Sequence, residues 1–249
     1  MVLTVLTVLT CLRWREKFPV SSHPVLALTG APASFPVSEA HLGLARSLEW
    51  TDLWRERGES WVETNMGRGG LRYLAIHLRN GLDWVAACEH SKTGGEGGLA
   101  NLFSSAQCLG YNNQHGHLTR DLCLPTEQII IQQMEQIIRY HDQGRYNSPA
   151  LTIIIIRQTQ LKHVYVASDN DHMIARLGQV FPGVKFYKQS DTSSEEGFLL
   201  DLVILGQSDH FIGNCVSSFS AFVKRTRDVL GLQSSFWKFS LETLSKTKL

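Results

Sequence analysis

The sequence predicts an α/β fold in which a parallel β-sheet is covered by helices. Short apolar runs typical of buried strands occur at residues 71–78, 164–167, 184–187 and 210–212. Segments with helical spacing of apolar residues alternate with these runs, at residues 127–140, 171–180, 198–205 and 218–229. Strands that alternate with helices favour right-handed, doubly wound connections, so we expect the strands to lie parallel in one sheet.

The composition is that of an ordinary globular protein. Of its 249 residues, 43% are hydrophobic and 19% are charged, which excludes a disordered or collagen-like chain. The 24 basic residues nearly balance the 23 acidic ones, so no broad attraction to nucleic acid or to anionic lipid is predicted. Any bound phosphate must therefore be held by local groups.

Residues 1–70 are expected to form an N-terminal connector with a helical segment. The opening MVLTVLTVLTCL is apolar, but it lacks the cationic start and cleavage site of a secretory signal and is too short to span a bilayer. Four prolines between residues 19 and 36 fix extended or turn backbone. A helical spacing of apolar residues follows at residues 39–58.

Polar residues that could bind a ligand follow the predicted strands. In an open parallel sheet, ligands bind at the carboxyl ends of the strands, where His77 and Arg79 follow the first strand. Ser217 and Ser218 open the last helix, either as simple N-caps or as part of a phosphate site built on the free amides of the first turn. Arg79 is either salt-bridged or the charge that a diphosphate requires. We expect Arg79 and the serines to meet over one pyrophosphate.

Other patterns are weaker. The glycines at 67, 69 and 70 precede a strand, whereas a dinucleotide fingerprint follows one, so a nicotinamide cofactor is disfavoured. His115 and His117 lack spaced partners for a metal, and the five cysteines form no CxxC pair, so no metal site is predicted. Asp201 lies within the apolar run FLLDLVILG and is either turned to solvent or a buried carboxylate held by a donor-rich ligand.

Several ordered motifs resemble one known family. The motifs are HLRNGLDW, QCLGY, LCLP, VYVASD and above all DLVILGQSDHFIGNCVSSFSAFVKRTRD. Together they are similar to the GDP-fucose protein O-fucosyltransferases that modify EGF-like repeats, and the likeness runs from about residue 14 to residue 236. The resemblance implies a GT-B glycosyltransferase, with residues 71–236 as its Rossmann-like, C-terminal GDP-fucose-binding domain and residues 237–249 as a divergent tail.

The resemblance also implies roles for particular residues. GDP-fucose would be the donor of an inverting transfer that requires no metal or other cofactor, with Arg79 as the catalytic residue that stabilises charge on the departing diphosphate. Asp201 would hold the guanine or its neighbourhood. The remaining donor-binding positions would be His77, Ser217, Ser218 and Phe219, with Asp83 and Asp169 in second rank.

Disulfides, compartment and partners are implied in the same way. The family's cysteines are paired, which suggests Cys88 with Cys123 and Cys108 with Cys215 and leaves Cys11 free. Such bridges belong to an oxidising compartment such as the endoplasmic reticulum lumen, in contrast to the missing signal. The acceptors would be EGF-like repeat proteins such as Notch-type receptors, with no nucleic-acid or membrane partner.

The chain also departs from the family pattern. It has no counterpart of the N-terminal half, it ends in KTKL instead of an ER-retrieval tetrapeptide, and residues 146–158 look like an insertion. We therefore expect an N-terminally truncated form. One alternative function is a non-catalytic nucleotide-sugar-binding or chaperone-like domain for EGF-like clients, and another is a cytosolic enzyme that uses a different nucleotide.

Overall fold

The computed structural model describes residues 16–23, 49–68, 71–90, 105–110, 113–142, 161–190 and 194–239. The chain divides into two units, Met1–Glu49 and Trp50–Leu249. In the first unit, a turn follows Pro19, whose carbonyl accepts from the amides of Ser22 and His23. The glycine-rich segment 94–98 and the proposed insertion at residues 146–158 lie outside the described residues.

The second unit alternates helices and strands. In chain order its elements are α3 (Asp52–Asn65), β1 (Leu74–Leu78), α4 (Leu82–His90), α5 (Ala106–Leu109), α6 (Arg120–Cys123), α7 (Glu127–Asp142), β2 (His163–Ser168), α9 (Ile174–Val180), β3 (Lys185–Tyr187), α10 (Glu195–Gln207), β4 (His210–Gly213), α11 (Ser218–Val229) and β5 (Gln233–Phe236). No helix in this part of the chain, as far as it is described, is long and apolar enough to cross a membrane.

Five strands of the described residues form one parallel sheet, in the order β3-β2-β1-β4-β5. The α/β fold with a parallel sheet is therefore confirmed. Ile76 in the central strand pairs with Val166 on one side and with Ile212 on the other. The chain runs outward from β1 to β3 and then returns to place β4 on the opposite side of β1, so the strand order reverses between β1 and β4.

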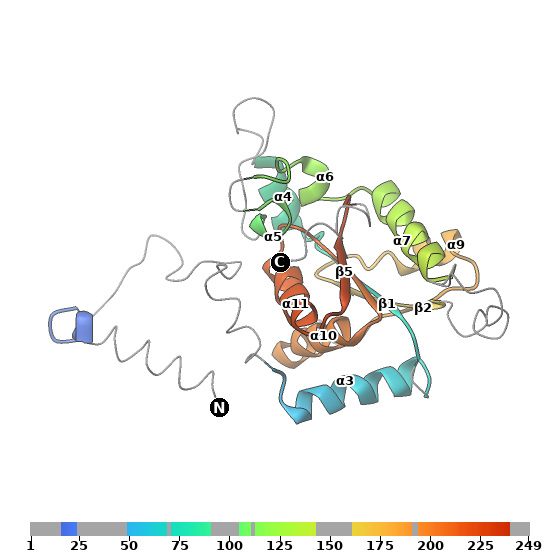
Figure 1. Ribbon diagram of the computed structural model, residues 1–249, viewed down its shortest axis with the longest axis horizontal. Coiled ribbons are helices and arrows are strands. Elements are labelled where there is room, and N and C mark those ends of the chain that lie inside the picture. The colour runs from blue at the N-terminus through green and yellow to red at the C-terminus, as the bar shows by residue number, and fades with distance from the viewer. Residues whose placement is uncertain are drawn as a thin grey trace. The chain divides into compact units, whose positions relative to one another are not determined.

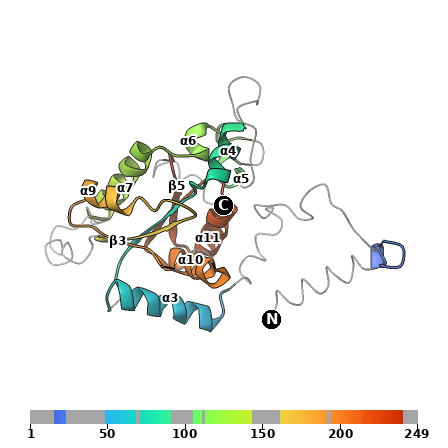
Figure 2. The same ribbon diagram turned by 180° about the vertical axis from the view of Figure 1, so that it is seen from behind.

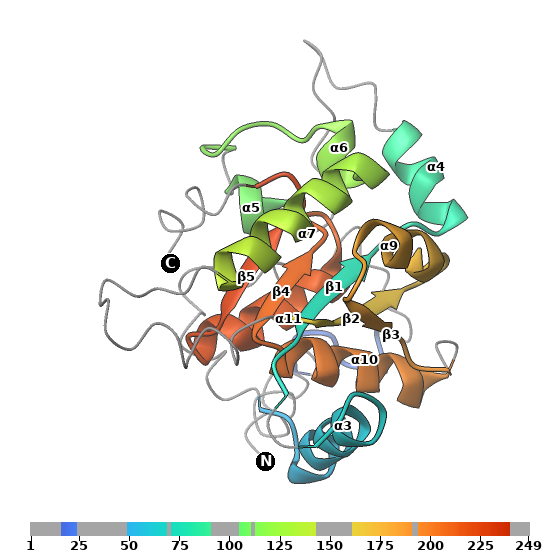
Figure 3. The same cartoon turned by 90° about the vertical axis from the view of Figure 1, so that its right-hand side faces the viewer.

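Helices cover both faces of the sheet (Figures 1 and 3). On one face, the side chains of Leu74, Ile76 and Leu78 pack against α7 and α9. On the other face, Ala75 and Tyr165 pack against α10, α11 and α3. Since successive residues of a strand point to opposite faces, His77 lies on the same face as Ala75.

A disulfide-linked cap forms a third cluster. Buried residues of α4, α5 and α6 share one hydrophobic cluster, and Figures 1 and 2 show these helices in the upper part of each view. Cys88 of α4 is bonded to Cys123 of α6, and Cys108 of α5 is bonded to Cys215 in the loop after β4. These are the two pairs that the resemblance implied. The second bond ties the cap to the segment that leads into α11.

The structure corrects some predicted boundaries. The helix expected over residues 39–58 is wrong at residues 49–51, which are not helical. Residues 52–58 belong to α3, which begins at Asp52 and continues to Asn65, and residues 39–48 are not among those described. The helix expected from residue 171 begins at Ile174, because Met173 adopts a left-handed backbone conformation with φ 54°. The strand β5, with the sequence QSSF, was not predicted because it lacks an apolar run.

The buried side chain of Arg227 links α11 by hydrogen bonds to the end of α10 and to β5. Its side chain is fully buried, and its guanidinium donates to the carbonyls of Gly206 at 2.9 Å, Ser208 at 2.7 Å and Gln233 at 2.6 Å. Its Nε also donates to the Ser234 hydroxyl at 3.1 Å. Burial lowers the pKa of Arg227 to about 10, so the group stays charged at neutral pH.

We expect Arg227→Lys to lower the free energy of unfolding by about 2–4 kcal/mol, because an ammonium with three donors leaves some of these buried acceptors without partners. Chemical denaturation measures the loss. Arg225→Lys on the same helix is the matched control, since the Arg225 guanidinium lies over the Phe222 ring and makes no comparable set of buried bonds among the described residues. Equal effects of the two substitutions would contradict this role of Arg227.

Candidate functional site

The site lies where the strand order reverses. Ligands of open parallel sheets bind outside the carboxyl ends of the strands at such a point. The carboxyl end of β1 supplies His77 and Arg79, and the carboxyl end of β4 leads through a short loop to Ser217 at the start of α11. The two strands are direct neighbours, so both segments reach the same edge of the sheet.

His77 contacts the first turn of α11. Its Nδ1 lies 2.7 Å from the hydroxyl oxygen of Ser220, and its ring centroid lies 4.7 Å from that of Phe219. The side chain is 4% exposed, and its backbone carbonyl accepts from the Trp237 indole at 3.0 Å. Burial, with a smaller contribution from the Arg79 charge, lowers the pKa of His77 to about 3. The imidazole is therefore neutral at physiological pH.

The start of α11 presents amide groups to the same edge. Ser217 is the N-cap, and its hydroxyl accepts from the amide of Ser220 at 3.5 Å. Ser218 is exposed, and the amides of Ser218 and Phe219 have no acceptor among the described residues. Free amides at a helix start, together with the helix dipole, favour an anion.

Arg79 is held by two carboxylates and an aromatic ring. Its guanidinium forms ion pairs with Asp169 and, at 2.6 Å, with Asp83, and it lies 5.0 Å from the Trp84 ring. The pKa of Asp83 is lowered, mainly by its hydrogen bond from Arg79. The structure thus brings Asp83 and Asp169 together with Arg79. Among the described residues, no hydrogen bond or ion pair links Arg79 to α11.

The two carboxylates differ in how firmly they are fixed. Asp169 accepts from the amides of Asn80 at 2.9 Å and Gly81 at 3.0 Å, and a Cβ on Gly81 would collide with this carboxylate. The Asp83 side chain is 71% exposed, compared with 25% for Asp169. Asp83 is therefore the partner of Arg79 that an anionic ligand can replace at the smaller cost.

Asp201 interacts with residues that are different from those around His77 and Arg79. It is buried on α10 and accepts from the hydroxyl of Tyr165 on β2, whose ring packs edge-on against Trp61. Burial raises the pKa of Asp201 to about 6. A groove of about 840 Å³ between α3 and α10 is lined by Trp61 and by Leu200, the neighbour of Asp201. Among the described residues, no hydrogen bond or ion pair links Asp201 to His77, Arg79 or α11.

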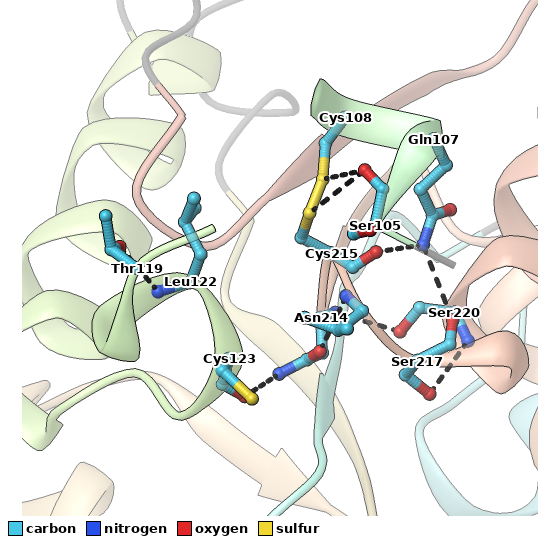
Figure 4. Close-up of a disulfide and its surroundings, with 11 residues drawn as sticks. Ser105, Gln107, Cys108, Thr119, Leu122, Cys123, Asn214, Cys215, Ser217 and Ser220 are labelled. Carbon is cyan, nitrogen blue, oxygen red and sulfur yellow. Dashed lines mark hydrogen bonds between the residues drawn. A yellow bond between two sulfur atoms is a disulfide. The ribbon is translucent and has the colours of Figure 1, made fainter. Parts of the chain in front are cut away.

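Two residues of the site, Ser220 and Gln107, were missed by sequence reasoning, and Asn214 was placed at a strand end without a role (Figure 4). Ser220 looks like an ordinary helix residue, yet its hydroxyl contacts His77. Asn214 is fully buried, and Gln107 donates to the carbonyl of Cys215 at 2.6 Å. A polar residue directly after an apolar strand was the available signal for Asn214, whereas nothing in the sequence marks Gln107.

The described residues contain no group of three or more His, Cys, Asp or Glu side chains able to hold a metal ion. The candidate site therefore consists of a neutral imidazole, a helix start and a paired guanidinium, without a ligand set for a cation.

Comparison with known proteins identifies the family of the chain. The family profile of GDP-fucose protein O-fucosyltransferase matches residues 6–230. The chain belongs to this family. GDP-fucose protein O-fucosyltransferase 1 of Caenorhabditis elegans is 34% identical over 221 residues, which cover 88% of this chain and 50% of the relative. The chain thus spans about half the length of the curated relative that it matches.

Solved structures of the family share the fold. A crystal structure of POFUT1 in complex with GDP matches with a TM-score of 0.67 and 33% identity, over 91% of this chain and 60% of that chain. A POFUT1 structure in complex with GDP-fucose matches with the same TM-score and identity, over 92% of this chain and 58% of that chain. The predicted family resemblance is therefore confirmed.

The raised pKa of Asp201 predicts a pH-dependent stability. Between about pH 4 and pH 6, this carboxyl is protonated in the folded state and ionised in the unfolded state, so folding becomes less favourable as pH rises through that window, by up to about 3 kcal/mol. We expect Asp201→Asn to remove this component. Denaturation of both proteins from pH 4 to pH 7 measures the difference in slope.

Tyr165→Phe provides a second variant for the same measurement. It removes the hydroxyl that donates to the ionised Asp201, so we expect the loss of stability to become larger and to extend to higher pH. Parallel pH profiles of the wild-type protein and Asp201→Asn would show that the carboxyl does not titrate in this range.

Proposed function

We propose that this chain is the donor-binding part of a protein O-fucosyltransferase, which transfers fucose from GDP-fucose to serine or threonine in EGF-like repeats with inversion at the sugar. The contact between His77 and the first turn of α11 carries the proposal, because it joins the end of β1 to a helix start with free amides. Family membership and the GDP-bound structures of POFUT1 support a guanine nucleotide as the ligand.

The proposed chemistry is electrostatic. Departure of GDP from fucose places negative charge on the diphosphate, and fixed positive groups at that position lower the barrier. Arg79 would supply the charge, and the amides at Ser218 and Phe219 would supply hydrogen bonds to phosphate oxygens. Arg79 remains charged throughout, so its proposed role is stabilisation of the leaving group and not proton transfer.

The roles of the remaining residues follow from their positions. His77 would contact the donor from beside Phe219, and Ser217 would hold the helix start in shape. Asp83 and Asp169 would orient Arg79. We also retain Asp201 as a proposed residue near the guanine, because the groove beside it offers space for a ring.

The compartment and the acceptor belong to the same proposal. Two disulfides fit a protein that folds in an oxidising compartment, which supports the endoplasmic reticulum lumen. EGF-like repeats as acceptors, with Notch-type receptors among them, rest on the family resemblance. The alternative of a non-catalytic binding or chaperone-like domain shares the donor site and differs in the absence of transfer.

The first test is GDP binding measured by isothermal titration calorimetry on the folded, disulfide-bonded chain. We expect Arg79→Gln to weaken GDP binding by at least tenfold, because a charge-assisted contact to phosphate contributes about 1.5–3 kcal/mol. Arg72→Gln is the matched control, since Arg72 precedes the other end of β1 and pairs with Asp209 at 2.7 Å. We expect the control to change the affinity by less than twofold.

Two outcomes would reject parts of the proposal. Absence of GDP binding by the wild-type chain at millimolar nucleotide would reject donor binding. Transfer of radiolabelled fucose to a folded EGF-like repeat separates the enzyme from the binding-only domain. The assay includes, as a second protein, the portion of the relative that this chain does not match. Transfer that Arg79→Gln abolishes would support the enzyme, and GDP binding without transfer would support the alternative.

A further inference from the structure

The hydroxyl of Ser220 is held in one orientation by its surroundings. It accepts from the amide of Asn214 at 2.8 Å and lies 2.7 Å from Nδ1 of His77. The Ser220 side chain is fully buried, and its hydroxyl has no other partner among the described residues. Gly213 permits this approach, because a Cβ at that position would lie 2.9 Å from the Cβ of Ser220.

The position of Asn214 is itself fixed. Its Oδ1 accepts from the amide of Val216 at 3.0 Å, and its Nδ2 donates to the carbonyl of Cys123 at 2.9 Å. The disulfide of the next residue, Cys215, ties the same loop to α5. Figure 4 shows this loop between α5 and the first turn of α11. The Asn214 amide that orients Ser220 is therefore held by two links to the cap, the Asn214 side-chain bond to Cys123 and the disulfide of Cys215.

These contacts determine which nitrogen of His77 carries the proton. If Nδ1 carried it, the Ser220 oxygen would accept twice, and its own buried proton would lack an acceptor, which is unfavourable inside a protein. If Nε2 carries it, the Ser220 hydroxyl donates to Nδ1 and every bond at this oxygen is satisfied. The second arrangement leaves an Nε2–H group, for which the described residues offer no acceptor.

We propose that Ser220 is a positioning residue that holds His77 as the Nε2–H tautomer, so that His77 presents a neutral hydrogen-bond donor to an oxygen of the bound nucleotide. This inference rests on the proposed function, because the ligand is taken to be the GDP part of the donor. It adds a requirement on that ligand: the atom facing Nε2 is an acceptor, as phosphate and ribose oxygens are. The low pKa of His77 keeps this donor neutral across the assay range.

A double-mutant cycle on GDP affinity tests the inference. We expect Ser220→Ala to raise the Kd for GDP by about three- to tenfold, close to the effect of losing one hydrogen bond. If Ser220 acts through His77, then Ser220→Ala should have no further effect in a His77→Gln background. Full additivity of the two substitutions, or an unchanged Kd in Ser220→Ala, would overturn the proposal.

The protein offers a matched control for the loss of a buried bond. Ser235 on β5 is also fully buried, and its hydroxyl lies 3.0 Å from Nε2 of His210. Ser235→Ala therefore removes the same atom from the same kind of serine–histidine pair outside the site. We expect it to lower thermal stability as much as Ser220→Ala does, while the Kd for GDP stays within twofold of the wild-type value.

Nuclear magnetic resonance provides a readout that does not depend on GDP. In the ¹⁵N-labelled chain, long-range ¹H–¹⁵N correlations of the imidazole distinguish the two tautomers, and His77 is assigned as the signal missing from His77→Gln. We expect Nε2–H in the wild-type protein, and an Nδ1–H signal would overturn the proposal. If the wild-type chain fails to bind GDP, the proposed function fails, while this spectrum still decides the role of Ser220.

Discussion

The contact between the His77 imidazole and the first turn of α11 is the interaction on which the site depends. It spans 143 residues of sequence and joins the first turn of α11 to the central strand of the sheet. Because β1 pairs directly with β4, the ends of both strands lie at one edge, and the buried His77 ring packs against the first turn of α11 there. The contact thus adds a side-chain link between β1, which leads to Arg79, and the helix start that follows β4.

The cap of α4, α5 and α6 explains why the helix start has a defined shape before any ligand binds. The disulfide of Cys215 and the bond from Gln107 hold the loop after β4 from one side, and Asn214 holds it through Cys123 from the other. Cross-links of this kind restrict the conformations of a loop. Donors that are already oriented stabilise developing charge without a further cost of reorganisation.

The sequence predicted four of the five described strands because apolar runs mark them, and it proposed candidate site residues from their places at strand ends. An apolar run identified β1, and the rule for strand ends then identified His77 and Arg79. It could not predict Ser220, whose partner on β1 is brought near only by the pairing of β1 with β4. The ion pair of Arg79 with Asp169 likewise depends on the register that sets Leu78 beside Ser168, and β5 is buried by its neighbours without an apolar pattern of its own.

The carboxylates paired with Arg79 determine the electrostatic cost of binding an anion at this guanidinium. One guanidinium faces two carboxylates, so the group carries a formal charge of −1 before a ligand arrives. Asp169 is retained by two backbone amides, whereas Asp83 is largely exposed and can return to water with little loss. Under the proposed function, a diphosphate that displaces Asp83 would gain the freed edge of the guanidinium, and the free amides at the start of α11 would offset part of its remaining charge.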